Sequence, residues 1–219
     1  MKIHIVFDLD GTLTDTQTIH QKLESDFLKS KGIDIQPEGV GLQYAGRTPK
    51  EWIPEVLMSK KINFTQEEVN AFVDWKNEVL ISLLHAGKID LIPHAFETLI
   101  YLYNKGYKIG ISSGSGKERI KELVKYFHLE EMILASTSSN EVEHKKPYPD
   151  VFLATFEKIE KIYGTPDTTY VIGDGWADVE GGHKAGAKTV WLNPGKIAKL
   201  DASYCDFEIG DLKELQNIL

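Results

Sequence analysis

Hydrophobic residues gather in five short runs, separated by longer stretches in which polar and apolar residues mix. Each run has about the length of a buried strand, and several are rich in isoleucine and valine. Helical patterns separate the later four runs, and this alternation predicts a parallel α/β sheet with helices on both faces. The predicted strands cover residues 3–7, 108–112, 132–135, 169–173 and 188–192.

The interval between the first two runs, from residue 16 to residue 88, carries helix signals and no convincing strand. Ile19, Leu23 and Phe27 recur every four residues, and Gly32 is placed to end the helix that they predict. An all-helical module is therefore expected between the first strand and the rest of the sheet.

Three further helix starts are marked by a capping box, in which Ser or Thr is followed three residues later by Glu. They begin at Thr48, Thr65 and Ser115. Pro54 lies inside the first of these helices and is expected to kink or shorten it. Another helix is expected after Pro93. Its apolar residues are Phe96, Leu99, Ile100 and Tyr103.

Composition and charge place the chain among ordinary globular proteins and narrow its partners. Of the 219 residues, 42% are hydrophobic and 26% are charged, which disfavours disordered and fibrous classes. The net charge of −8 disfavours binding to nucleic acid or to anionic membranes, because both require a cationic surface. A small anionic ligand is still compatible with this charge, since a few local cations in a cleft are enough to bind it.

The single cysteine, Cys205, cannot form an internal disulfide, which favours a reducing compartment, and we expect it to be a small buried hydrophobic residue. The apolar start of the chain is too short for a secretory signal, and no stretch approaches the ~18 apolar residues of a membrane span. These features predict a soluble cytoplasmic protein without a membrane partner. The oligomeric state is unknown from the sequence.

The strongest chemical signal is Asp8-Leu9-Asp10-Gly11-Thr12, which directly follows the first predicted strand. Ligands of parallel α/β sheets bind at the carboxyl edge of the strands, and a turn at Gly11 can aim both aspartates into one crevice there. Because Asp-Gly is also common in ordinary turns, this motif alone favours a catalytic and a structural interpretation about equally.

A second motif, Ser112-Ser113-Gly114-Ser115-Gly116, follows the second predicted strand. Hydroxyls, backbone N–H groups freed by glycine and the positive end of the next helix together make an anion site. Runs of Ser and Gly are also ordinary loops, so this motif alone is a weak signal.

A third motif contains Lys146 within Lys145-Lys146-Pro147-Tyr148-Pro149. The prolines stiffen the backbone and would hold the lysine as a fixed cation. Taken alone, the motif is better explained as a surface turn.

The fourth motif, Gly173-Asp174-Gly175-Trp176-Ala177-Asp178, follows the fourth predicted strand. Its two carboxylates would face those of the first strand and complete an oxygen-rich site for a hard cation. Mg²⁺ takes few protein carboxylates and keeps waters and phosphate oxygens, which suits this number of ligands.

In this order the four motifs resemble those of the haloacid dehalogenase superfamily, and the resemblance covers essentially the whole chain. It implies an α/β fold with a Rossmann-like parallel sheet core, residues 1–15 and 89–219. It also implies an inserted all-α cap domain, residues 16–88, similar to the C1-type caps of phosphoglycolate-phosphatase-like and β-phosphoglucomutase-like members.

The resemblance also implies catalytic roles. Asp8 would be the nucleophile and a metal ligand, and Asp10 would act as general acid and then general base while binding the metal through its backbone carbonyl. Lys146 would bridge Asp8 and the phosphoryl oxygens. A phosphate dianion repels an anionic nucleophile, so Mg²⁺ and Lys146 would have to offset that charge before Asp8 attacks.

The remaining family positions concern binding. Ser113, rather than Ser112, falls at the phosphate-binding position, and Gly114 follows it. Asp174 would ligate Mg²⁺, and Asp178 would support the metal's surroundings.

Three residues outside the four motifs stay open on the sequence. Arg47 could meet the part of the substrate distal to its phosphate, or be an exposed arginine near a helix start. His20 could face the active site, with a half-buried structural role slightly favoured. Trp176 could wall the pocket or pack under its loop.

Among the reactions of this superfamily, hydrolysis of a phosphate ester is favoured. Dehalogenation is disfavoured by the presence of Asp10, and phosphonate hydrolysis by that residue and by the lack of a clear Schiff-base lysine in the cap. A β-phosphoglucomutase-like phosphomutase is the alternative, although Asp174 lacks the adjacent acidic residue typical of mutases. A catalytically inactive phosphate-binding module is disfavoured, because no catalytic position is lost.

We therefore predict a Mg²⁺-dependent phosphatase that forms an aspartyl-phosphate and whose partner is a small phosphorylated metabolite, not nucleic acid. The sequence leaves phosphoglycolate, small sugar phosphates and nucleoside monophosphates open as substrates.

Overall fold

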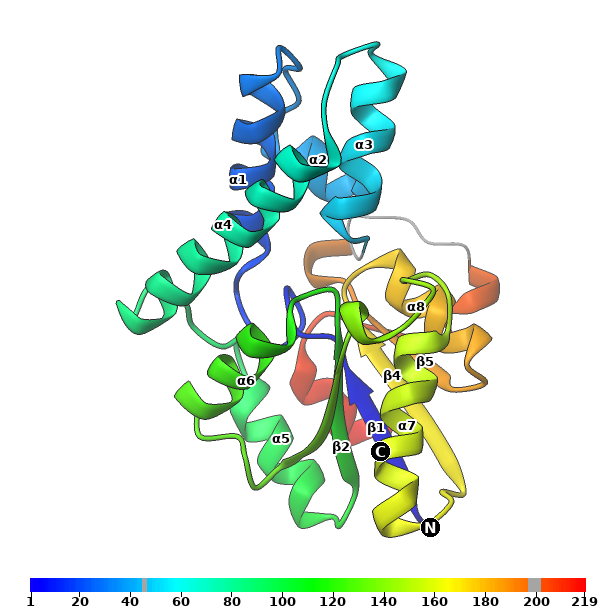
Figure 1. The fold of residues 1–219 in the computed structure, drawn as a ribbon. Helices are drawn as coiled ribbons and strands as arrows, with labels where there is room; N and C mark the ends of the chain where they lie inside the picture. The colour runs from blue at the N-terminus through cyan, green and yellow to red at the C-terminus, as the bar shows by residue number, and fades with distance from the viewer. Residues whose placement is uncertain (45–46, 197–201) are drawn as a thin grey trace.

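The computed structural model describes residues 1–44, 47–196 and 202–219. Within these residues, six strands form one parallel sheet in the order β3-β2-β1-β4-β5-β6 (Figure 1). The strands are β1 (Ile3–Phe7), β2 (Lys108–Ser113), β3 (Ile133–Ser138), β4 (Thr168–Gly173), β5 (Lys188–Leu192) and β6 (Phe207–Ile209).

The five predicted strands are confirmed, and the sixth was missed. β6 has three residues and pairs with β5 at the edge of the sheet, so it lacks the apolar run that marks the others. β3 extends to Ser138, beyond its predicted end, because its second half consists of small polar residues that hydrophobicity does not reveal.

Alternate residues of β1 face opposite sides of the sheet, as the period of two in a strand requires. Ile5 and Phe7 belong to the larger apolar cluster, which includes residues of α5 and α6, whereas Val6 packs with α7 on the other face. The sheet is thus covered on both faces, as predicted. The helices of this part are α5 (Ala95–Asn104), α6 (Lys117–Tyr126), α7 (Asp150–Tyr163) and α8 (Trp176–Lys184).

The apolar residues noted for α5 lie mostly on its outer face. Phe96, Ile100 and Tyr103 are exposed, whereas Leu99 and Leu102 are buried against the sheet. Because α5 is apolar on two sides, a repeat of three and four residues fits both faces, and spacing alone does not identify the buried one.

The first four of the helices that the described residues form between β1 and β2 stand together beyond the carboxyl end of the sheet (Figure 1). They enclose an apolar cluster of their own, in which Phe27 stacks on Phe72 and Tyr44 stacks on Trp52, both pairs with ring centroids 4.2 Å apart. The domain boundaries given above stay a prediction. The helices are α1 (Gln17–Ser30), α2 (Pro37–Tyr44), α3 (Pro49–Ser59) and α4 (Gln66–His85).

α4 connects this cluster with the core around the sheet. Its first half contributes Val69 and Phe72 to the cluster among the four helices, while Leu80 and Leu84 belong to the sheet's cluster. Through α4, the helical segment is therefore anchored to the sheet by buried apolar contacts as well as by its two chain connections.

Some of the predicted helix starts and ends are confirmed and others are not. The capping box at Thr65 forms in full, and Gly32, with a φ of 80°, follows the end of α1 as predicted. Thr48 stands before α3, but its hydroxyl donates to the Glu51 carboxylate, so the box is incomplete. Pro54 does not shorten α3, which continues to Ser59.

α6 begins at Lys117, next to Gly116, as predicted, but the predicted capping box is wrong, because the Ser115 hydroxyl donates to Asp10, 2.6 Å away, instead of capping the helix.

Cys205 is half-buried rather than buried, and its thiol donates to the Phe207 carbonyl oxygen, 3.1 Å away.

Among the helices of the described residues, none combines the length and the apolar character needed to cross a bilayer.

His4 makes the fold sensitive to acid. Its side chain, in the middle of the sheet, is buried, and within the described part of the chain neither ring nitrogen has a hydrogen-bond partner. Burial, aided by the charges of Lys2 and Lys108, lowers the pKa of His4. The folded state thus binds a proton less readily than the unfolded state, and stability is lost as the pH falls through the unfolded value of about 6.5.

Replacing His4→Phe should raise the free energy of unfolding by about 1–2 kcal/mol, because it removes unpaired buried polar atoms. It should also reduce the loss of stability between pH 7 and pH 5, measured by urea unfolding. His128→Asn, at an exposed position whose φ of 56° suits asparagine, is the control and should follow the wild type. An unchanged pH dependence in His4→Phe would contradict this account.

Candidate active site

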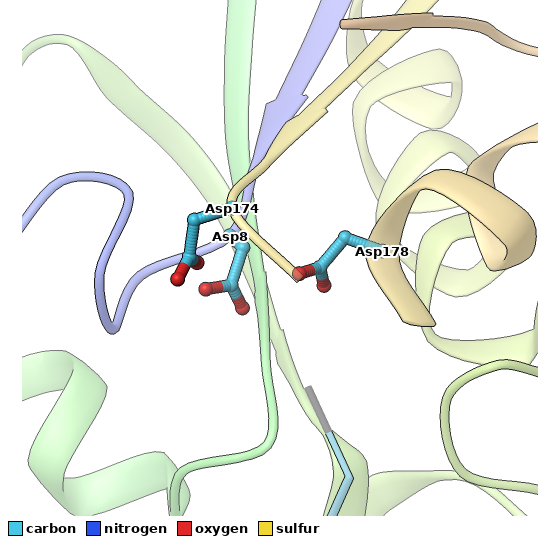
Figure 2. Close-up of side chains that lie close together, drawn as sticks. All are labelled: Asp8, Asp174 and Asp178. Atoms are coloured by element: carbon cyan, nitrogen blue, oxygen red, sulfur yellow. The ribbon is translucent and has the colours of Figure 1, made fainter. Parts of the chain in front are cut away.

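Three predicted site residues follow neighbouring strands at the carboxyl edge of the sheet. Asp8 follows β1, Asp174 follows β4, and Ser113 ends β2, and these strands are adjacent in the sheet. Asp178 comes from the first turn of α8, and its side chain points toward the other two aspartates (Figure 2). The topology therefore brings together residues that are far apart in the sequence.

Asp8, Asp174 and Asp178 form a compact acidic cluster, with one carboxylate oxygen of each within 4.8 Å of the others (Figure 2). Burial raises the pKa of Asp8 well above its usual range, with the charges of Asp178 and Asp174 adding to the shift and Lys146 opposing it. Burial and Asp178 likewise raise the pKa of Asp174 to about 7. The cluster thus carries more negative charge than the protein balances, and a divalent cation with oxygen ligands fits it.

Lys146 lies at the centre of this arrangement, with 2% of its surface exposed. Its ammonium group donates to Oδ1 of Asp8 at 2.7 Å, to Oδ1 of Asp178 at 2.6 Å and to the carbonyl oxygen of Ser112 at 2.8 Å. Burial alone would lower the pKa of Lys146, but the charges of Asp178 and Asp8 outweigh it and raise the pKa. Lys146 is therefore a fixed cation that touches the predicted nucleophile.

Close contacts between the first and fourth motifs hold Asp174 in place. Gly11 has a φ of 90°, and a Cβ atom there would lie 2.4 Å from Oδ2 of Asp174, so only glycine fits. The Thr12 hydroxyl donates to Oδ1 of Asp174 and accepts from its backbone N–H, both at 3.0 Å. The indole N–H of Trp191 donates to the Asp174 carbonyl oxygen at 2.9 Å.

The two serines at the end of β2 point in different directions. Ser112 hydrogen-bonds with Thr155 and Val151 of α7, on one face of the sheet. Ser113 is buried, and its Oγ accepts a hydrogen bond from the Ser115 N–H at 3.0 Å. Gly114 lines the cavity described below. Ser112 is thus engaged by α7, whereas Gly114, the residue after Ser113, lies at the cavity, and the choice of Ser113 as the phosphate-binding residue stays a prediction.

The carboxylate of Asp10 is enclosed by donors that the sequence reasoning did not connect with it. The hydroxyls of Thr16 and Ser115 donate to it at 2.6 Å, and Nε2 of His20 lies 3.2 Å away. The guanidinium of Arg119, on α6, contacts both of its oxygens and is itself 2% exposed.

These contacts decide the protonation of Asp10. Burial alone would raise the pKa of Asp10, but the charge of Arg119 and the contacts of His20 outweigh it and hold the pKa well below its usual range. Arg119 was missed because it lies in a run of charged residues typical of a solvated helix face. Its spacing of four from Ser115 was the available signal.

His20 faces the site rather than the apolar cluster of the helical segment. It contacts Asp10 and lines the cavity, and burial together with Lys76 lowers the pKa of its ring. The slightly favoured prediction, a structural histidine, was therefore wrong in one respect, because the ring points toward the site.

A cavity of about 160 Å³ lies between the carboxyl edge of the sheet and the helical segment. Asp8, Asp10 and Asp174 line it from one side, and residues of α1, α3 and α4 line it from the other. Trp176 is partly exposed and is not among the described lining residues.

Arg47 lines the cavity, but its guanidinium is engaged by Glu55, with nitrogen–oxygen distances of 2.7 and 3.0 Å. The structure therefore places Arg47 at the cavity, as the substrate-binding interpretation requires, with its charge already paired.

Comparisons with known proteins agree with this geometry. A family model described as "Haloacid dehalogenase-like hydrolase" matches residues 5–192. The pyrophosphatase PpaX of Bacillus mycoides is 27% identical, in an alignment that covers 100% of this chain and 98% of the relative. PpaX of Bacillus cereus strain ATCC 10987 is 25% identical, with 100% and 97% covered.

The fold is shared with solved structures, two of which illustrate it. The β-phosphoglucomutase of Clostridium difficile has a TM-score of 0.82 at 22% identity, with 100% of this chain and 96% of that chain covered. CbbY of Rhodobacter sphaeroides, in complex with phosphate, has a TM-score of 0.80 at 19% identity, with 98% and 96% covered. The family model covers most of the chain and includes all four motifs, so the protein belongs to the haloacid dehalogenase-like hydrolase family.

Proposed function

We propose that this protein is a Mg²⁺-dependent phosphatase that hydrolyses a small phosphate monoester through an aspartyl-phosphate on Asp8. The contact of Lys146 with both Asp8 and Asp178, beside Asp174, carries this proposal. In it, a buried ammonium group and three carboxylates that could serve as nucleophile and metal ligands lie within one small volume, which supports the proposal. The phosphatase names of the relatives and the absence of an acidic residue next to Asp174 support hydrolysis over the mutase alternative.

In the first step, a carboxylate oxygen of Asp8 attacks phosphorus, and the bond from phosphorus to the leaving oxygen breaks. Lys146 holds that carboxylate in position and neutralises charge on the phosphoryl oxygens, which Ser113 and the Gly114 backbone would also bind. Mg²⁺, held by Asp8, Asp174 and the Asp10 carbonyl and supported by Asp178, would supply further charge neutralisation.

Asp10 would give a proton to the leaving oxygen, then take one from the water that opens the acyl phosphate and releases phosphate and free Asp8. In the arrangement described here, Arg119 holds Asp10 ionised. Protonation of Asp10 therefore requires that its contact with Arg119 weaken when the substrate binds.

We also propose that residues 16–88 act as a cap domain on the core of residues 1–15 and 89–219. The separate apolar cluster of the four helices and the cavity beneath them support this division. A closed cap would keep water away while the acyl phosphate forms. A cytoplasmic location remains our proposal, supported by the lone cysteine.

Asp8→Asn should lower kcat by at least about 1,000-fold on p-nitrophenyl phosphate, because an amide does not attack phosphorus. Asp10→Asn should instead accumulate phosphorylated Asp8 with acetyl phosphate, detected by mass spectrometry, because dephosphorylation loses its base. The exposed neighbour variant Asp15→Asn is the control and should keep wild-type turnover. Wild-type turnover by a verified Asp8→Asn protein would refute the mechanism.

The raised pKa values of Asp8 and Asp174 predict how Mg²⁺ acts on stability. A carboxyl group whose pKa is higher in the folded state stabilises the fold at low pH. That stability is lost as the pH rises from the unfolded value of about 3.9 through the folded one. Without metal, Asp8 and Asp174 should thus contribute less to the free energy of unfolding at pH 8 than at pH 5. Mg²⁺ should restore this stability at pH 8.

At about 100 times its Kd, Mg²⁺ should add about 2.7 kcal/mol at pH 8, which raises Tm by about 5–10 °C for a chain of this size. The rise should be much smaller at pH 5, where Asp174 is protonated. Asp174→Asn should remove most of the rise at pH 8 and most of the Mg²⁺-dependent activity, with Asp26→Asn, an exposed site, as control. Full activity in excess EDTA would show that no metal is needed.

A further inference from the structure

The charges on the helical wall of the cavity indicate what kind of leaving group it accepts. Among the described residues of α1, α3, α4 and their connections that line the cavity, three side chains are acidic and three are basic. The wall is thus electrically balanced. The acidic residues are Glu24, Glu51 and Asp74, and the basic ones are Arg47, Lys50 and Lys76.

Each of the three cations already has a carboxylate partner. Arg47 is held by Glu55, which lies outside the cavity lining, at 2.7 Å. Lys50 lies 3.6 Å from Asp74, and the ammonium of Lys76 lies 2.5 Å from Oε1 of Glu24. An anionic leaving group would have to displace a carboxylate from one of these cations. Otherwise its own negative charge would remain unpaired.

The pair formed by Glu24 and Lys76 is the most buried of the three, with 9% and 3% of the side chains exposed. Because the two charges offset each other at low exposure, separating them would be costly, whereas leaving them paired keeps free donor and acceptor positions. A hydroxyl group donates to the carboxylate and accepts from the ammonium, so it can bind without separating the pair.

The other polar side chains of this wall have the same dual character. Gln17, Gln21 and Asn77 line the cavity, and each carries an amide that both donates and accepts hydrogen bonds. On the opposite side, Lys145 lines the cavity with its ammonium group directed at the carbonyl oxygens of Ser139 and Val142, so two of its three protons are used.

We propose that the leaving group is uncharged and carries hydroxyl groups, so that the substrate is a monophosphate of the polyol or sugar class. This inference rests on the proposed phosphatase function and narrows its substrate. It disfavours pyrophosphate, whose leaving group is itself a phosphate anion, and phosphorylated carboxylic acids such as phosphoglycolate. The wall therefore differs from what the names of the PpaX relatives would suggest for this chain.

A matched pair of substrates tests the proposal. 2-Hydroxyethyl phosphate and phosphoglycolate differ in one group, a hydroxymethyl in place of a carboxylate. With Mg²⁺, kcat/KM for 2-hydroxyethyl phosphate and for glycerol 3-phosphate should exceed kcat/KM for phosphoglycolate and for pyrophosphate by about tenfold or more, a difference of about 1.4 kcal/mol or more.

Glu24→Gln should leave the charge of Lys76 unpaired and shift this ratio by about tenfold toward phosphoglycolate. Asp26→Asn, which removes an exposed carboxylate from a lysine pair on the same helix, should leave the ratio unchanged. Thermal unfolding of both variants verifies that they fold. The ratio in the wild type decides the proposal even if Glu24→Gln is unstable.

A preference of the wild type for phosphoglycolate or pyrophosphate, with normal turnover of p-nitrophenyl phosphate, would overturn the substrate class and leave the phosphatase function intact. An unchanged ratio in a folded Glu24→Gln protein would likewise count against the balanced wall. Absence of turnover on every ester, p-nitrophenyl phosphate included, would overturn the proposed function and this inference with it.

Discussion

The buried contact of Lys146 with Asp8 and Asp178 is the interaction on which the rest of the site depends. A lysine with 2% of its surface exposed is stable only if its charge is paired and its protons are hydrogen-bonded, and here all three protons have acceptors. The same contact joins three segments, the ends of β1 and β2 and the start of α8. Removing the lysine would leave two buried carboxylates close together, which is costly, so the catalytic arrangement and the local fold are stabilised by the same pair of ion contacts.

Much of the fold and of this centre could be predicted from the sequence because both depend on order along the chain. A motif at the end of a parallel strand must lie at one edge of the sheet, so the strand assignment alone brings Asp8, Ser113 and Asp174 together. The outer face of α5 and the strand β6 could not be predicted. Both depend on which neighbour covers a residue, and the local pattern of Phe96 or of Phe207 does not contain that information.

The partners of Asp10 show a second limit. Asp10 and Arg119 are 109 positions apart, and in the sequence Arg119 is one of several charged residues on a helix that looks solvated. Only the packing of α6 beside the first motif shows that this arginine is buried. Ser115 shows the same limit. Its sequence context favours a helix cap, but its hydroxyl donates to the charged Asp10, which forms the stronger hydrogen bond.

The two sides of the cavity differ in their balance of charge. Around Asp8 the carboxylates outnumber the cations; burial and this excess raise the pKa of Asp8, and the cluster suits a metal ion, whose charge would in turn attract a phosphoryl group. On the helical side, each of the three described cations that line the cavity is matched by a carboxylate, so little net attraction for an anion remains there. An ester with one charged end and one uncharged, hydroxyl-bearing end would match this polarity along its length. With a divalent cation bound to the carboxylates of the sheet edge, the phosphoryl group would be attracted toward that edge and not toward the balanced helical side, so charge would orient the substrate.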